Sequence, residues 1–179
     1  MAKSKPSMSL LDIFILYLVR DGLKTLYQLK AEAGISIGAA SPSLHRLEDQ
    51  YTYIYRSTTT GRRGKKVVDP RGKIEYEPHI MSALFFQSDS LAPFEADLPT
   101  DTESVARLVV LAEAKEKSGL AKKTLKNAIG ERQKRVRGAV PVAGRSKIAT
   151  RYRSIVQACE TARLKAEGAA LKKILARIK

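Results

Sequence analysis

The sequence predicts a mainly α-helical chain with one small β-hairpin, arranged as a winged helix-turn-helix domain followed by a helical dimerisation region. Three capped apolar helical patterns come first, and a stretch of alternating residues with a basic, glycine-containing tip follows them. The last third of the chain holds a long helical pattern with a narrow apolar stripe. We therefore expect a first domain over residues 1–77, a connector over 78–100 and a helical region over 101–179.

The first helical pattern begins after Ser9, which has Asp12 three residues later and Gly22 behind the run. A serine followed by an acidic residue at this spacing predicts a capped helix. Its apolar residues surround most of the helix, so we expect it to be central and nearly buried. Thr25 predicts the cap of a second helix, which Gly34 ends.

The third helix is expected to begin near Ser36 and to continue to about Gln50. Ala40, Leu44 and Leu47 recur at spacings of four and three, which gives one narrow apolar stripe. That helix is therefore half buried and half presented to its surroundings. Its opposite face offers Gly38, Pro42, His45, Arg46 and Asp49.

A hairpin follows the helices. Tyr51, Tyr53 and Tyr55 alternate with other residues as in a strand, and we expect them to pack the hairpin onto the helices; the alternative is stacking on unpaired bases. Residues 58–64 form a polar loop with two glycines, and residues 65–69 are expected to return as the partner strand.

The last third begins with a capping-box pattern at Thr100 and Glu103, ahead of a helix expected to run to about Lys117. A second, basic helix precedes the interruption at 138–144. From Ser146 onward one helix has apolar residues at steps of four and three, which is typical of helix pairing, and we expect it to pair with a second copy of the chain. The predicted dimerisation residues are Ile148, Tyr152, Ile155, Cys159, Ala162, Ala166, Leu171 and Leu175.

The composition points to a polyanionic partner. Lys and Arg number 33 against 18 Asp and Glu, which gives the 179-residue chain a net charge of +15. Such a surface attracts nucleic acid. The excess is concentrated at the end of the chain, because residues 119–179 hold 17 basic and only 3 acidic side chains.

Other classes of function find little support in the sequence. It contains no phosphate-binding Gly-Lys-Ser/Thr loop and no nucleophile elbow, so we expect neither an enzyme nor a bound cofactor or metal. The apolar run 13–19 is shorter than the roughly 20 residues that a membrane span needs, and no membrane partner is expected. Cys159, the single cysteine, cannot form an intramolecular disulfide, which favours a cytoplasmic location.

Three compact helices followed by a basic hairpin is the order of a winged helix-turn-helix, in which the third helix enters the major groove and the wing contacts the backbone. The cations beside Gly61 and Gly64 suit phosphate contact, whereas Arg46 is expected to influence base preference. The predicted DNA-contacting residues are Thr25, Gln28, Ser36, Ser41, Ser43, His45, Arg46, Thr59, Arg62, Arg63, Lys65 and Lys66.

Residues 38–48, Gly-Ala-Ala-Ser-Pro-Ser-Leu-His-Arg-Leu-Glu, resemble the third-helix motif of the PadR-like winged-helix transcriptional regulators. The wing over 61–73 is similar to the basic wing of that family and its exit, and residues 26–29 resemble its second-helix motif. Ser41 stands where the family usually has Tyr. The resemblance covers about residues 9–77, and it implies a DNA-binding fold and a dimer held by C-terminal helices.

The sequence therefore predicts a homodimeric, sequence-specific regulator of transcription that binds double-stranded DNA. Repression is the expected mode, because blocking a promoter needs only occupancy, and a small-molecule effector of unknown identity stays open. One alternative is a non-specific nucleic-acid packaging or RNA-binding protein driven by the basic last third. Another is an assembly module whose last helix binds a different protein.

Overall fold

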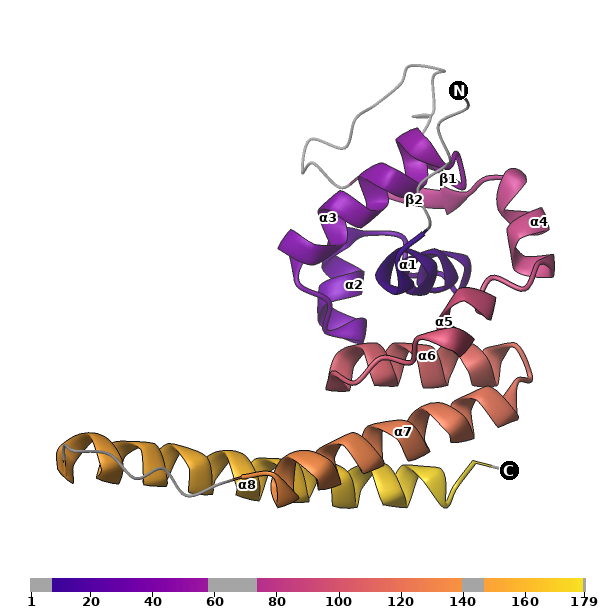
Figure 1. Ribbon diagram of the computed structural model, residues 1–179. Coiled ribbons are helices and arrows are strands. Elements are labelled where there is room, and N and C mark those ends of the chain that lie inside the picture. The colour runs from indigo at the N-terminus through magenta and orange to yellow at the C-terminus, as the bar shows by residue number, and fades with distance from the viewer. Residues whose placement is uncertain (1–7, 58–73, 140–146, 179) are drawn as a thin grey trace, which may run out of the picture. The chain divides into compact units, whose positions relative to one another are not determined.

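The computed structural model describes residues 8–57, 74–139 and 147–178 (Figure 1). It is mainly helical with one two-stranded antiparallel sheet, which is the coarse class that the sequence predicts. The chain divides into two compact units, Met1–Ala92 and Pro93–Lys179.

The first two helices begin and end where the sequence predicts. In α1 (Leu10–Arg20) the Ser9 hydroxyl accepts a hydrogen bond from the Asp12 amide at 3.1 Å, and the Asp12 carboxylate accepts one from the Ser9 amide at 3.2 Å. Thr25 and Gln28 form a second capping box at the start of α2 (Leu26–Ala33). Both predicted caps are confirmed, because capping depends on residues only three positions apart.

Gly34 ends α2 in the left-handed conformation, with φ at 67°. We expect Gly34→Ala to lower the free energy of unfolding by about 1 kcal/mol, because a Cβ in this conformation crowds the following carbonyl. No atom lies within 4 Å of the added Cβ, so the cost comes from the backbone alone. Urea denaturation of the two proteins measures it.

A matched control is Gly38→Ala, at a helical position of the same unit where an added Cβ also meets open space. This change should raise the free energy of unfolding by about 0.5 kcal/mol, because alanine loses less backbone entropy than glycine in a helix. Equal effects of the two substitutions would contradict the assigned role of Gly34.

The third helix is α3 (Ile37–His45), which continues into the π-helical turn η1 (Arg46–Gln50). The sequence predicts one helix over this whole stretch, and the structure differs from that in the wider last turn. Ala40, Leu44 and Leu47 are all fully buried, which confirms the predicted apolar stripe. They join the core of the first unit together with residues of α1 and α2.

The sheet pairs β1 (Ile54–Ser57) with β2 (Glu75–Pro78), with Ser57 opposite Glu75 and Ile54 opposite Pro78. The sequence predicts residues 65–69 as the partner strand. Those residues lie outside the described part of the chain, and the partner that the structure gives to β1 comes after them.

The expected packing of three tyrosines is only partly correct. Tyr51 and Tyr53 are half buried and stack with their ring centroids 5.8 Å apart. Tyr55 is exposed, and the buried residue of β1 is Ile54. The alternation fails because Thr52 has a φ of 56°, so the chain turns before the strand begins.

The predicted boundary at residue 77 is too early. Helix α4 (Met81–Gln87), which the sequence predicts inside the connector, belongs to the first unit. Its Phe85 lies against Tyr53, with ring centroids 5.2 Å apart, and its Phe86 meets the edge of Tyr17 at 4.9 Å. These aromatic contacts explain why the segment after β2 is part of the domain and not a linker.

The second unit contains the short α5 (Ala92–Ala96), α6 (Thr102–Ala114), α7 (Ser118–Arg137) and α8 (Lys147–Leu175). The cap of α6 is Asp101, which accepts a hydrogen bond from the Ser104 amide at 2.8 Å, and not Thr100 as predicted. Aspartate at this position also offers a negative charge to the positive helix end.

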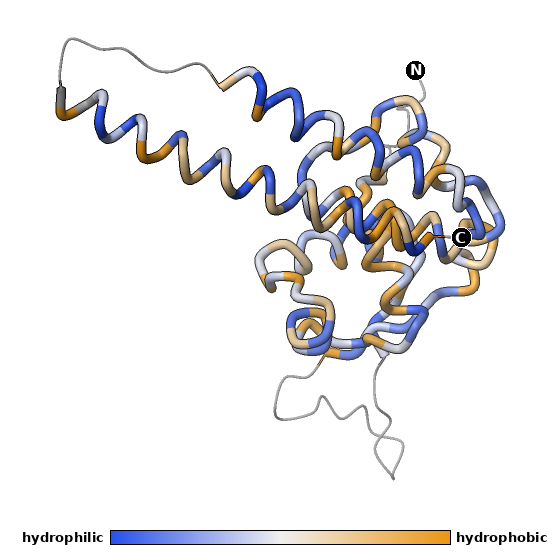
Figure 2. The backbone as a smooth tube through the Cα atoms, turned by 90° about the horizontal axis from the view of Figure 1, so that it is seen from below, coloured by the Kyte–Doolittle hydropathy of each residue, from blue (hydrophilic) through white to orange (hydrophobic). Residues whose placement is uncertain are grey.

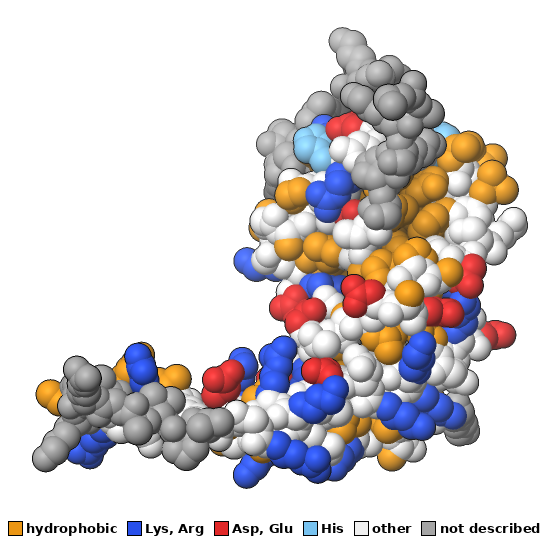
Figure 3. All heavy atoms as spheres, viewed as in Figure 1, with side chains coloured by type: hydrophobic (Ala, Val, Ile, Leu, Met, Phe, Trp, Pro, Cys, Tyr) orange, Lys and Arg blue, Asp and Glu red, His pale blue; other side chains and the backbone are white. Residues whose placement is uncertain are grey.

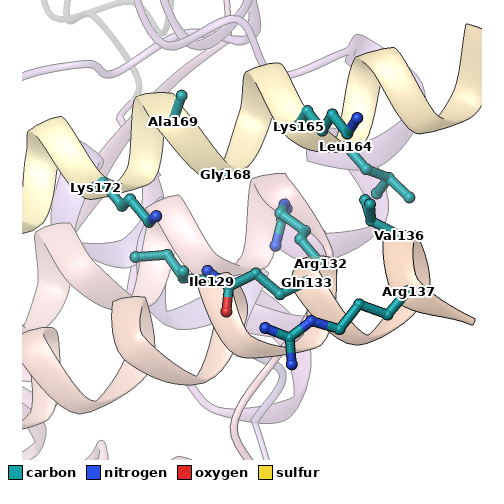
Figure 4. A pocket seen from close by; sticks show the side chains of 10 residues that line it. All are labelled: Ile129, Arg132, Gln133, Val136, Arg137, Leu164, Lys165, Gly168, Ala169 and Lys172. Atoms are coloured by element: carbon teal, nitrogen blue, oxygen red, sulfur yellow. The ribbon is translucent and has the colours of Figure 1, made fainter.

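Helix α7 lies along the C-terminal part of α8 (Figures 1 and 2). Leu164 and Leu171 of α8 are buried, and Figure 4 shows Leu164 pointing toward Val136 of α7. Leu171, which the sequence assigns to dimerisation, is therefore used within the chain. Leu175 is half buried, so it too is only partly available.

The N-terminal part of α8 extends past α7, and Figure 2 shows apolar positions recurring along it. Ile148, Tyr152 and Ile155 are 84%, 68% and 57% exposed, and Cys159 is exposed as well. The predicted Ala162 and Ala166 are also exposed. Within the described ranges, no helix is both long enough and apolar enough to cross a membrane.

Candidate nucleic-acid interface

Helices α2 and α3 follow one another through a short connection at residues 34–36, and one face of α3 is exposed. Its outward row, at steps of four residues, consists of Ile37, Ser41 and His45, all of which are exposed. Gly38 and Pro42 flank this row and are exposed too. Ser36 caps the helix, and its hydroxyl accepts a hydrogen bond from the Ala39 amide at 3.2 Å. Gly38, Pro42 and His45 belong to the face that the sequence predicts to be presented, and Ser41 is a predicted DNA contact, whereas Ile37 belongs to neither set.

Arg46 does not belong to that free surface. Its Nε and Nη2 donate to the two carboxylate oxygens of Asp12 at 3.1 and 2.7 Å. Asp12 is only 1% exposed, so the pair ties α1 to the end of α3. The influence of Arg46 on base preference stays a prediction, and it does not take the form of paired recognition of guanine, because the paired donors already hold a carboxylate.

Burial alone would raise the pKa of Asp12, but hydrogen bonds from Arg46, Ser43 and Ser9 outweigh it and lower that pKa below its usual value. The carboxylate is therefore charged at neutral pH. Ser43 is fully buried, and its hydroxyl accepts a hydrogen bond from Arg46 Nη2 at 3.1 Å. The prediction that Ser43 contacts DNA is wrong, because it lies on the side of α3 that faces the core.

Thr25 and Gln28 are also committed to the fold. Gln28 Oε1 accepts hydrogen bonds from the Lys24 and Thr25 amides at 2.9 and 3.0 Å. The Thr25 hydroxyl donates to the same oxygen at 3.2 Å and accepts from the Gln28 amide at 3.1 Å. An adenine contact through both ends of the glutamine amide is therefore not available, and the two residues act as a cap.

The C-terminal end of the outward row is acidic. His45 Nδ1 lies 3.3 Å from Asp49 Oδ2, and Glu48 pairs with Arg56 of β1 at 2.9 Å. Ligand atoms of His45, Glu48 and Asp49 lie within 4.8 Å of one another, which is the one such group among the described residues. Because Arg56 compensates the charge of Glu48, Asp49 leaves a net negative charge at this end of α3.

The hairpin places both ends of the predicted wing beside η1. Arg56 holds β1 to η1 through Glu48, and Ser57 and Glu75 are register partners. The chain thus leaves and returns at one point, and the sequence between them carries six basic residues and one acidic residue. The predicted contacts Thr59, Arg62, Arg63, Lys65 and Lys66 lie outside the described residues.

Two exposed apolar residues of this surface are absent from the predicted set. Tyr27 is 75% exposed in the first turn of α2, and Ile37 is 49% exposed in the first turn of α3. Both line one groove of about 410 Å³, together with Ile74 and Gln28. The sequence indicates that Ile37 is exposed, because Ile37 lies off the buried stripe and one turn before Ser41.

The second unit offers a broad cationic surface. Figure 3 shows Lys and Arg side chains gathered over α7 and α8. Arg137, Lys165 and Lys172 surround a groove of about 310 Å³ between these helices, with Ile129 and Leu164 among its apolar lining residues (Figure 4). This cationic surface follows two helix faces, and a second, smaller pocket of about 190 Å³ beside it is lined by the ion pair of Arg132 and Glu167.

No protein-family model matches the chain, and no curated protein matches its sequence. The interface is therefore defined by its own geometry. Its parts are the outward row of α3, the groove beside Ile37 and the hairpin base from which the basic segment departs.

Proposed function

We propose that the chain is a homodimeric, sequence-specific double-stranded DNA-binding regulator of transcription. It reads the major groove with the outward row of α3 and contacts the backbone with the basic segment between β1 and β2. It acts by occupancy, as a repressor in the cytoplasm, and it is not an enzyme. The resemblance of residues 38–48 and 61–73 to PadR-like regulators supports the same conclusion.

One observation carries the proposal: an exposed helix face and the base of a strongly basic hairpin lie on the same unit, joined by the Arg56–Glu48 pair. An α-helix fits the width of the major groove. A cationic loop beside it contacts phosphates and releases counterions on binding. The ion pair between Asp12 and Arg46 in the same unit stabilises the fold and does not cover this surface.

The exposed face of α8 supports the dimer. Ile148, Tyr152 and Ile155 repeat at the steps of four and three that helix pairing requires, and they have little cover from their own chain. A two-fold dimer would place two α3 helices on half-sites about 10 base pairs apart, or a multiple of that spacing. The operator is then roughly palindromic. Light scattering should show a dimer, whereas a monomer favours an assembly module with a different partner.

Selection of bound sequences from a random DNA pool tests the function directly. The full chain should enrich one motif and bind it at least ~10³-fold more tightly than random DNA at physiological salt. Binding without any enriched motif would contradict the proposal. It would support the second candidate, a non-specific nucleic-acid packaging or RNA-binding protein, which the exposed cations of α7 and α8 favour.

The double variant Arg62→Ala/Arg63→Ala separates these two candidates. It should weaken binding to operator and random DNA alike and flatten the slope of log K against log salt by about two, because each lost phosphate contact removes about 0.9. Fluorescence anisotropy over a salt series measures both effects.

The charge-matched control is Arg151→Ala/Arg153→Ala, which removes two exposed cations from α8. It should change the slope little if the wing is the backbone contact. A larger effect of the α8 pair than of the wing pair would favour the packaging protein.

A further inference from the structure

The outward face of α3 lacks the side chains that usually read bases through paired hydrogen bonds. No Arg, Lys, Asn or Gln occurs from Ile37 to His45. Two candidates close to this face are engaged in the fold, since Arg46 binds Asp12 with Nε and Nη2 and Gln28 accepts capping bonds with its Oε1. Paired recognition of guanine by Arg or of adenine by Gln or Asn is thus not what this face offers.

The face offers apolar surface at its N-terminal end instead. Ile37 occupies the first turn of α3 and is 49% exposed, although its neighbours on the buried stripe are fully covered. It shares its groove with Tyr27, which is 75% exposed. Because Tyr27 and Ile37 each lie in the first turn of a helix, the apolar surface that they form has a fixed shape.

The orientation of α3 on DNA decides what Ile37 would meet. Recognition helices of this class contact base edges with their N-terminal residues. The opposite end of the row carries the exposed Asp49, whose charge opposes approach to phosphates, whereas the charge of Glu48 is compensated by Arg56. Ile37 and Ser41 therefore lie at the end that enters the groove.

We infer that Ile37 reads thymine, through contact of its side chain with the C5-methyl group in the major groove, and that Ser41 one turn later makes the neighbouring polar contact. Thymine is the one standard base that presents a methyl group there, and an apolar side chain distinguishes it by burying that methyl. This inference rests on the proposed function, and it adds which base the proposed regulator recognises. Each operator half-site then carries a thymine at the position facing Ile37.

Replacing thymine by deoxyuridine tests the contact, because uracil pairs identically and lacks only the methyl group. In the selected operator, each thymine is replaced in turn and binding of the full-length dimer is measured. At one position per half-site the replacement should weaken binding of the unmodified protein about fourfold, the effect of one buried methyl group. The Ile37→Ala variant should bind the thymine operator at least about fourfold more weakly than the unmodified protein does. Its binding should not change when uracil replaces thymine at that position.

Two further variants make the result decisive. Ile37→Val keeps a branched side chain and should keep the uracil effect, whereas Ile80→Ala, which removes an exposed isoleucine that does not line the groove, should bind as the unmodified protein does. Specific binding with no uracil-sensitive thymine, or with equal sensitivity in Ile37→Ala, would overturn the inference and leave the proposed function standing. Absence of any sequence preference would overturn both.

Discussion

Replacing Arg46 with Met should lower the free energy of unfolding of the first unit by about 2 kcal/mol, less than the loss of a fully buried ion pair costs, because the Arg46 side chain is 36% exposed. The reason is the state in which Asp12 is left. Its carboxylate is 1% exposed and would keep its hydrogen bonds with Ser9 and Ser43, without the two charged donors at 3.1 and 2.7 Å. Urea denaturation followed by circular dichroism measures the loss.

Two companion variants separate pairing from packing. Arg46→Lys keeps the charge but loses the two-pronged geometry, so its loss should be smaller than that of Arg46→Met. Combining Asp12→Ala with Arg46→Met should recover part of the stability, because no unpaired charge is left in the core. If Arg46→Met retains full stability and changes only base preference, the arginine reads DNA after all.

The pH dependence of the same variant has a definite sign. The pKa of Asp12 is lowered in the folded protein, so its contribution to stability is fully present above its ordinary value, about 3.9, and is lost as the pH falls through the lowered value. Without Arg46, the pKa of Asp12 loses the strongest of the hydrogen bonds that lower it, so the charged carboxylate is less favoured in the folded protein. The difference in stability between the two proteins should therefore be largest at neutral pH and shrink in acid.

Arg132→Met is expected to have the largest effect in the second unit, at about 3 kcal/mol, because Arg132 is buried at the point where three helices meet. Its Nε donates to Glu167 of α8 at 2.9 Å, and its Nη2 donates to the Thr102 hydroxyl of α6 at 2.8 Å. Its Nη1 reaches the Thr100 carbonyl at 3.2 Å. Met fills the space but satisfies none of these acceptors.

The matched control is Arg135→Met, which removes an exposed arginine from the same helix and should change stability by less than about 0.5 kcal/mol. Thermal unfolding by circular dichroism compares the two. Hydrogen exchange should show faster exchange at the ends of α6 and α8 in Arg132→Met. Equal stability of both variants would show that the buried arginine contributes nothing to holding α8 on α7.

Local features were predictable because the residues that create them are neighbours in the chain. The capping boxes at Ser9 and Thr25, the left-handed Gly34 and the buried stripe of α3 all depend on spacings of a few residues. Two local expectations failed for an equally local reason. Asp101 replaced Thr100 as the cap of α6, and the turn at Thr52 shifted the alternation that would have buried Tyr55.

The roles of the polar side chains on the candidate interface were not predictable in the same way. Arg46 lies 34 residues from Asp12 in the sequence. By spacing alone, Ser43 is expected on the surface of its helix and Leu171 on the face that pairs with a second chain. Their burial depends on which element packs against them. The same holds for the strand that pairs with β1, which lies beyond the segment that periodicity selects.

The sequence by itself determined the helices and their caps, the order of helices and hairpin, and the concentration of positive charge in the last third. Only the tertiary structure decided which polar groups form hydrogen bonds inside the molecule and which remain available to a partner. The physical reason is that a buried carboxylate such as Asp12 must find a donor, and that donor is chosen by proximity in space. The exposed row of α3 then consists of Ile37, Ser41 and His45, while the arginine that the sequence suggests is engaged with Asp12.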